Sequence, residues 1–199
     1  MTGNRPGAGA FVAVVGPSGA GKDTLIAEAR RTLAGDAGLV FVRRVVTRPS
    51  GAFEDHDTVA EEEFTRLEAE RAFALSWRAH GLAYGVPVAT VAVVASGAVA
   101  VCNLSRAAIA AARVRFRRTV TVLVTAPDEV IAARLAARGR ESAAEAGRRL
   151  AREATLQAGA VEFVIVNAGS PAEGGEKLVA CLREIRTALP AEASVSARA

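Results

Sequence analysis

The sequence predicts an α/β fold in which a largely parallel sheet of five strands carries helices on both faces. Two observations support this prediction. Short apolar segments alternate with helical patterns along the chain, and a glycine-rich turn joins the first strand to the first helix. The length of 199 residues suits one domain with a substantial hydrophobic core.

The predicted strands are apolar runs bounded by turn residues. The first, FVAVV at residues 11–15, ends at the glycine-rich turn. The helix that follows at residues 23–34 places Leu25, Ile26 and Ala29 on one face before Gly35 ends it. Further strands are expected at residues 39–46 (LVFVRRVV), 98–104, 120–126 and 162–167, and residues 73–79 are also expected to be extended.

Capping residues mark where the other helices begin. Thr58 with Glu61, and Ser142 with Glu145, have the spacing of a capping box. Ser170, followed by Pro171, opens a C-terminal helix that ends before Pro190. Other helices are expected after Ser105 and Pro127 and over residues 88–96, and residues 80–87 (HGLAYGVP) are expected to form a turn.

The composition narrows the class of protein. Hydrophobic residues make up 51% and charged residues 23%, which is typical of a globular chain, and no apolar run has the length of a membrane span. Cys102 and Cys181 lack metal-ligand spacing, and the N-terminus is a poor secretory signal, so we expect a cytoplasmic protein. The net charge is +4, but scattered arginines and 5% aromatic residues do not favour nucleic-acid binding.

The glycine-rich turn GPSGAGKDT, residues 16–24, nearly matches a phosphate-binding loop. Gly16, Gly21 and Lys22 occupy the expected positions between a strand and a helix. Lys22 is one of only two lysines among 25 basic residues, so its presence here is informative. The pattern predicts a P-loop that binds nucleotide phosphates, with the alternative that the glycines form an ordinary turn.

Asp23 stands where such a loop normally carries Ser or Thr, whose hydroxyl binds magnesium. The strand that should supply an acidic metal ligand, AVAVCNLSR, offers Asn103 instead. We therefore expect Asp23 to make the charged contact to Mg²⁺, directly or through water, with Asn103 assisting. The alternative is that Asp23 only caps the helix.

Arginines form two groups that suit anionic ligands. Arg43, Arg44 and Arg48 end the second strand, and Arg48 is the strongest candidate because Arg43 and Arg44 point to opposite faces. Arg134 and Arg138 share a helix face before Gly139, and Arg140 follows. Arginines around a helix break are typical of a closing lid, here expected at about residues 138–147, with Arg149 on the next helix. The alternative is an exposed charged hairpin.

The segment SWRAHGLAYGVP contains the only Trp and the only Tyr of the chain. Tyr84 is expected to donate its hydroxyl to a substrate phosphate, whereas Trp77 is expected to pack in the core. His80 is more often structural than catalytic in such a turn. His56, in the polar loop EDHD, is expected either to contact a sugar hydroxyl or to be an ordinary loop residue.

The order of these motifs resembles the ribose 1,5-bisphosphate phosphokinase family, a branch of the guanylate-kinase-like enzymes. The motifs are GPSGAGKD, VTRP, EDH, FALSWRAHGLAYGV, VCNLSR and RLAARGRES. The resemblance covers about residues 11–185, and GKD and NLSR are its most specific parts. True guanylate kinases carry Ser or Thr after the loop lysine and Asp on the strand that here contains Asn103. Phe53 departs from the family, which usually carries Gly before Glu54.

The resemblance implies one guanylate-kinase-like domain over residues 11–188. Its core would comprise residues 11–48 and 88–188, an acceptor-binding insertion would span about 49–87, and residues 1–10 and 189–199 would be disordered. It also implies a reaction, in which ATP with Mg²⁺ phosphorylates the 1-phosphate of ribose 1,5-bisphosphate to give 5-phosphoribosyl 1-diphosphate. The expected partners are these small molecules, and no binding to a membrane or to nucleic acid is expected. The oligomeric state stays open, and a homodimer is one of the alternatives.

Roles follow for individual residues. The expected catalytic residues are Lys22, Asp23, Arg138, Arg140 and Arg149. Nucleotide contacts are expected from Gly16, Pro17, Ser18, Gly19, Ala20, Gly21, Lys22, Asp23, Thr24 and Arg134. Acceptor contacts are expected from Arg48, Glu54, His56, Tyr84, Asn103, Ser105 and Arg106. Two alternatives remain: a kinase for GMP or another nucleoside monophosphate, and a non-catalytic binding module of the same fold.

Overall fold

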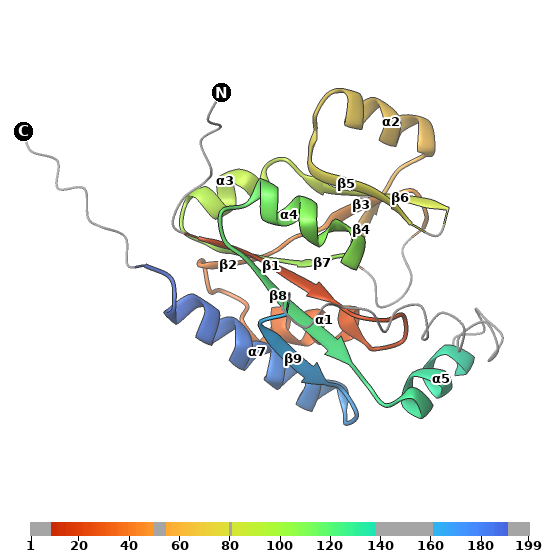
Figure 1. Ribbon diagram of the computed structural model, residues 1–199, viewed down its shortest axis with the longest axis vertical. Helices are drawn as coiled ribbons and strands as arrows, with labels where there is room; N and C mark the ends of the chain where they lie inside the picture. The colour runs from red at the N-terminus through yellow and green to blue at the C-terminus, as the bar shows by residue number, and fades with distance from the viewer. Residues whose placement is uncertain (1–8, 50–54, 80, 138–160, 191–199) are drawn as a thin grey trace, which may run out of the picture.

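The computed structural model describes residues 9–49, 55–79, 81–137 and 161–190 (Figure 1). A central sheet holds five parallel strands in the order β2-β7-β1-β8-β9. Its strands are β1 (Ala10–Val15), β2 (Leu39–Phe41), β7 (Val99–Asn103), β8 (Thr119–Thr125) and β9 (Phe163–Val166). The predicted five-stranded parallel sheet is therefore confirmed.

Helices cover both faces of this sheet, which gives three layers. On one face lie α1 (Lys22–Thr32) and α7 (Pro171–Thr187), and on the other α3 (Thr90–Ala95) and α4 (Ile109–Arg115), which the short 3₁₀ helix η1 (Arg106–Ala108) precedes. The helix α5 (Asp128–Ala137) follows β8 and packs through a small cluster of its own. No helix within the described ranges is long and apolar enough to cross a bilayer.

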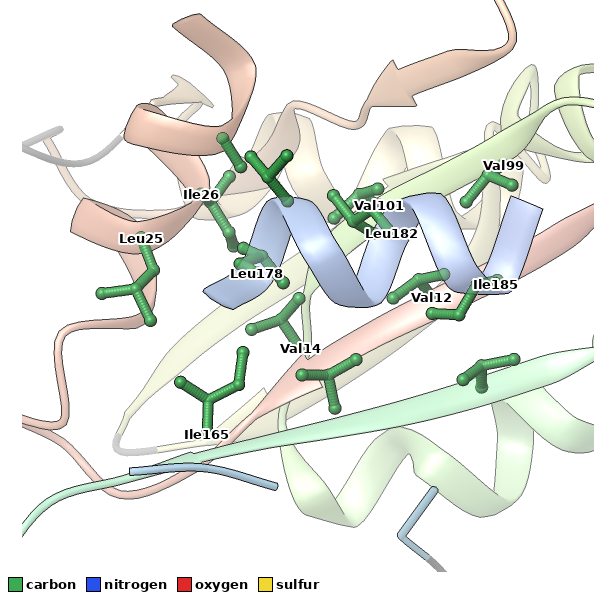
Figure 2. Packing of buried hydrophobic residues seen from close by; sticks show 14 of the residues in the cluster. Val12, Val14, Leu25, Ile26, Val99, Val101, Ile165, Leu178, Leu182 and Ile185 are labelled. Carbon is green, nitrogen blue, oxygen red and sulfur yellow. The ribbon is translucent and has the colours of Figure 1, made fainter. Parts of the chain in front are cut away.

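The core beneath α7 is built from valines of the strands and leucines of the helix (Figure 2). Val12 and Val14 of β1 alternate toward this face and contact the layer that contains Leu178 and Leu182, and all four are fully buried. Ser170 begins α7, as the sequence predicted, and the structure adds that it forms a capping box with Glu173. The core sheet and α7 thus form a rigid support for the loop that follows β1.

A second sheet of four strands lies beside the core, in the order β4-β3-β6-β5 (Figure 1). It contains β3 (Arg44–Val46), β4 (His56–Thr58), β5 (Phe73–Ala79) and β6 (Leu82–Pro87), and α2 (Glu61–Ala69) connects β4 to β5. Leu75 and Val86 join the buried cluster that also contains α3 and α4, so this sheet packs directly on the core.

The second sheet corrects three predictions. Residues 39–46 are not one strand, because β2 pairs in the core sheet and β3 in the second sheet. Residues 80–87 are not a turn, because β6 pairs with β5 as an antiparallel hairpin. Thr58 does not cap α2; it belongs to β4, and its hydroxyl donates to the Arg48 carbonyl at 3.0 Å. Local patterns of turn and capping residues were here overridden by pairing with distant strands.

Candidate active site

The loop between β1 and α1 requires glycine at both ends. Gly16 has a φ of 147°, and a Cβ there would lie 1.9 Å from the carbonyl oxygen of Val124 in β8. Gly21 precedes α1 in the left-handed conformation, with a φ of 91°, and a Cβ there would lie 2.5 Å from Asn167 Nδ2. Both positions therefore exclude side chains, which explains the glycine spacing of the motif.

Lys22 begins α1 and folds back over the loop. Its ammonium donates hydrogen bonds to the carbonyl oxygens of Gly16 and Pro17, at 2.8 and 2.9 Å. The cation therefore lies at the N-terminus of α1, where the helix dipole and free backbone N–H groups also favour an anion. This arrangement is chemically suited to hold a phosphate group.

Two side chains from distant elements form hydrogen bonds to the backbone of the loop. Asn167, directly after β9, is buried and donates from Nδ2 to the Ala20 carbonyl at 2.8 Å. Arg134 of α5 donates to the same oxygen at 3.5 Å, so this predicted nucleotide contact lies at the loop. Asn167 was not among the residues predicted from the sequence. Its position at the end of a core strand, the edge where ligands of open α/β sheets bind, could have pointed to it.

Asp23 and Asn103 meet beside the loop. Asn103, the last residue of β7, donates from Nδ2 to Asp23 Oδ1 at 2.6 Å. The residue that caps α1 is Gly21, without a side-chain hydrogen bond, so the geometry does not support the alternative in which Asp23 is a helix cap. Within the described residues no group of three or more His, Cys, Asp and Glu could hold a metal ion. A single carboxylate still suits Mg²⁺, because this ion commonly takes its other ligands from water and phosphates.

Arg44 of β3 faces Asp23 from the second sheet. Its Nη2 lies 3.8 Å from Asp23 Oδ1, and only 12% of its side chain is exposed. Its guanidinium lies over the ring of Tyr84, 5.7 Å from the centroid, and Tyr84 stacks on Trp77 at 5.3 Å. Arg44 could not be preferred over Arg43 from the sequence, because strand alternation alone does not say which face points inward.

A cleft separates α1 from the second sheet beside Asp23. The cleft is open to solvent on one side. The residues that line it are Asp23, Ile26, Ala27, Arg30, Val42, Arg44, Asp55 and Asn103. At its rim Asp55 forms ion pairs with Arg30 and Arg43. The hydrogen bond from Arg30 holds the pKa of the Asp55 carboxyl below its usual value. The cleft thus combines an apolar wall with charged groups, as a small anionic metabolite would require.

Arg48 and His56 meet at the edge of the second sheet. His56 is buried, and its Nε2 lies 3.1 Å from the backbone carbonyl oxygen of Arg48. The Arg48 guanidinium contacts the carbonyl of Pro49 at 3.5 Å. His56 therefore has a structural contact that fixes β4 against the end of β3, and its predicted sugar contact stays a prediction.

The remaining predicted residues divide into two sets. Ser105 precedes η1 without a side-chain capping bond, which corrects the expectation that it caps this helix, and Arg106 begins η1 just after β7. Glu54, His80, Arg138, Arg140 and Arg149, the predicted lid and the capping box at Ser142 lie outside the described residues. Both cysteines are free thiols, and burial raises the pKa of Cys102 to about 12, which makes it a poor nucleophile at neutral pH.

Known proteins similar to this chain fall into two groups. No family model matches the sequence. The ribose 1,5-bisphosphate phosphokinase PhnN of Methylobacterium radiotolerans is 50% identical over 88% of this chain and 98% of its own length. The enzyme of the same name from Acidiphilium cryptum is 50% identical over 91% of this chain and 96% of its own length.

Solved structures extend the likeness in fold. A guanylate kinase from Anaplasma phagocytophilum superposes with a TM-score of 0.66 at 20% identity, over 91% of this chain and 88% of that one. A gluconokinase from Sinorhizobium meliloti gives a TM-score of 0.51 at 17% identity, over 92% and 96%. At these identities the likeness concerns the fold alone.

Proposed function

This chain belongs to the ribose 1,5-bisphosphate phosphokinase family, and we propose that it transfers the γ-phosphoryl group of ATP to the 1-phosphate of ribose 1,5-bisphosphate. The products are 5-phosphoribosyl 1-diphosphate and ADP. The observation that carries the proposal is the pairing of Asp23 with Asn103 at 2.6 Å beside an intact phosphate loop. The same pair of residues distinguishes this family from true guanylate kinases in the sequence.

The reaction requires little covalent chemistry from the protein. A non-bridging oxygen of the 1-phosphate forms a bond to the γ-phosphorus, while the bond between that phosphorus and the β–γ bridging oxygen breaks and its electron pair leaves with ADP. The attacking oxygen is already anionic, so no strong general base is needed. Positioning and charge neutralisation must therefore supply most of the rate acceleration.

The residues of the site can divide this work. Lys22 would bind the β- and γ-phosphates at the N-terminus of α1, and Asn167 with Arg134 would keep the loop in shape through the Ala20 carbonyl. Asp23, held by Asn103, would hold Mg²⁺. When bound, this ion screens the charge between the two anionic substrates. The cleft beside Asp23 would then receive the acceptor.

The proposed insertion, residues 49–87, and the core, residues 11–48 and 88–188, would thus form opposite walls of the acceptor site. The connection from β2 in the core sheet to β3 in the second sheet consists only of Val42 and Arg43, so β3 lies in the second sheet although the proposed insertion begins at residue 49. The acceptor side would then comprise β3 together with β4, β5 and β6 of the insertion.

An acceptor screen tests the proposal. Purified protein with ATP and Mg²⁺ would be given ribose 1,5-bisphosphate, GMP or gluconate, with ADP release followed by a coupled assay and the new diphosphate identified by ³¹P NMR. We expect turnover with ribose 1,5-bisphosphate alone. Strong turnover with GMP and none with ribose 1,5-bisphosphate would instead identify a nucleoside-monophosphate kinase. Absence of ATP binding in calorimetry would identify a non-catalytic module.

A further inference from the structure

We propose that Arg44 is an acceptor-binding residue, whose guanidinium holds the phosphate group that receives the γ-phosphoryl group. This inference rests on the proposed function and adds to it a residue that was not among the acceptor contacts expected from the sequence. It starts from the contrast between two adjacent arginines. Arg43 is 51% exposed and pairs with Asp55 and Asp57, whereas the Arg44 side chain is 12% exposed and faces the cleft.

The hydrogen-bonding capacity of Arg44 points to a ligand. A guanidinium carries five N–H donors and is costly to bury without acceptors. Within the described parts of the chain, the Arg44 guanidinium donates no hydrogen bond. Its carboxylate neighbour, Asp23 Oδ1, lies 3.8 Å away, beyond hydrogen-bond distance, and that oxygen already accepts from Asn103. The donors of Arg44 are thus available to an anion in the cleft.

The Arg44 guanidinium is supported on one side by the stacked rings of Tyr84 and Trp77. Tyr84 stacks on Trp77 with an interplanar angle of 5°, and the Arg44 guanidinium lies over the Tyr84 ring. A guanidinium over an aromatic face keeps its edge free for in-plane hydrogen bonds. That edge is the part that binds two phosphate oxygens at once. The aromatic support therefore favours binding of an oxyanion by Arg44.

Position within the cleft identifies which phosphate would bind. Lys22 and Asp23 are neighbours in the chain, so the γ-phosphate on Lys22 and the metal on Asp23 would lie next to each other. Arg44 approaches Asp23 to within 3.8 Å from the opposite sheet. An acceptor phosphate held by Arg44 would consequently lie beside the γ-phosphate, where its negative charge most needs neutralising before the attack.

An alternative role for Arg44 is to position the Asp23 carboxylate. The contact is longer than a hydrogen bond, Asp23 remains 29% exposed, and Asn103 already orients the carboxylate. An ion pair of this kind contributes little by itself. The two roles differ in what they predict, since loss of a positioning residue would raise the Mg²⁺ requirement, whereas loss of an acceptor-binding residue would raise the KM for the acceptor.

The test compares Arg44→Gln and Arg44→Lys with the matched control Arg43→Gln. The KM values for ribose 1,5-bisphosphate and ATP would be measured at saturating co-substrate, together with a Mg²⁺ titration and thermal unfolding. For Arg44→Gln we expect the acceptor KM to rise by about tenfold or more, as loss of charged hydrogen bonds implies, while the KM for ATP stays within about twofold. Arg44→Lys should recover part of the loss, and Arg43→Gln should behave as wild type, because Arg30 still pairs with Asp55.

The proposal fails if the acceptor KM of Arg44→Gln is unchanged, or if only the Mg²⁺ requirement or the KM for ATP rises. Should Arg44→Gln not fold, the Arg44→Lys variant decides by the same comparison of KM values. Failure of the proposed function has a different signature, because the wild-type protein itself would then not turn over ribose 1,5-bisphosphate.

Discussion

The two sheets of this protein differ in how their strands are buried. All six residues of β1 in the core sheet are buried, whereas no strand of the second sheet is buried along its whole length: β3, β4 and β5 bury one residue each, and β6 buries three of six. The core sheet carries the phosphate loop, and the second sheet carries Arg44 on the other side of the cleft, with Tyr84 next to it.

This difference matches two tasks. Phosphate binding needs a loop whose backbone is fixed, and the loop is held by the wholly buried β1, by α1 and by Asn167. Acceptor binding needs side chains that can be exchanged without loss of the fold, and the partly buried strands of the second sheet provide this. We therefore expect substitutions in the core to act on nucleotide binding or stability, and substitutions in the second sheet to act on acceptor binding.

The largest effect is expected at Lys22. Lys22→Met removes the cation at the loop, and we expect kcat/KM to fall by roughly a thousandfold, because preorganised charges at the transferred group contribute about that much. Lys177→Met is the matched control, since Lys177 is the only other lysine and is exposed on α7. Steady-state kinetics would check both. Equal losses in the two variants would mean that Lys22 has no special role at the loop.

The stability of the two sheets provides the second comparison. Leu178→Ala opens a cavity in the fully buried core beneath α7 and should lower the free energy of unfolding by about 3 kcal/mol. Val45→Ala in β3 removes a half-buried side chain and should cost less than about 1.5 kcal/mol. Chemical denaturation would measure both values. A Val45→Ala loss as large as that of Leu178→Ala would contradict the contrast between the sheets.

Substitutions of two asparagines should distinguish metal binding from support of the phosphate loop. Asn103→Ala removes a hydrogen bond to the Asp23 carboxylate, and we expect kcat to fall by about tenfold at limiting Mg²⁺. Asn167→Ala removes the donor to Ala20 and should instead raise the KM for ATP. Activity measured across Mg²⁺ and ATP concentrations would distinguish them. Full activity of Asn103→Ala at limiting Mg²⁺ would show that Asn103 does not contribute to metal binding.

The smallest effect is expected for the ion pair between Asp55 and Arg30 at the rim of the cleft, and it depends on pH. The Arg30 hydrogen bond lowers the pKa of Asp55 from 3.8 in the folded state, so this ion pair stabilises the fold above about pH 4. The contribution is lost as the pH falls through the lowered pKa. Asp55→Asn should therefore lower the free energy of unfolding slightly at pH 7, by less than about 1 kcal/mol because the pair is partly exposed, and the difference from wild type should shrink as the pH falls below about 4. A difference that does not shrink with falling pH would assign the effect to something other than charge.

Sequence reasoning succeeded where local patterns and burial agree. The core strands are continuous apolar runs, and the loop, Asp23 and Asn103 could be placed because parallel strands end at one edge of the sheet. The start of α7 at Ser170 was also predicted, because its signal, Ser170 followed by Pro171, is local.

It failed where the structure depends on distant pairing. The residues GLAYGVP contain two glycines and a proline, yet antiparallel pairing with β5 makes β6 a strand. Whether Arg43 or Arg44 points inward depends on the pairing of β3 with β4 and β6, which residues 43–48 do not encode locally. Asn167 contacts a residue 147 positions away, so no local pattern reveals it.

The stack of Trp77 on Tyr84 has a spectroscopic consequence. The chain contains one Trp and one Tyr, and they lie together in the second sheet beneath the guanidinium of Arg44. The intrinsic fluorescence of the protein therefore originates in the second sheet, next to a residue that lines the cleft. Emission excited at the indole band reports on the surroundings of Arg44 without a label, so rapid-mixing fluorescence could time the arrival of a metabolite there separately from the events at the phosphate loop.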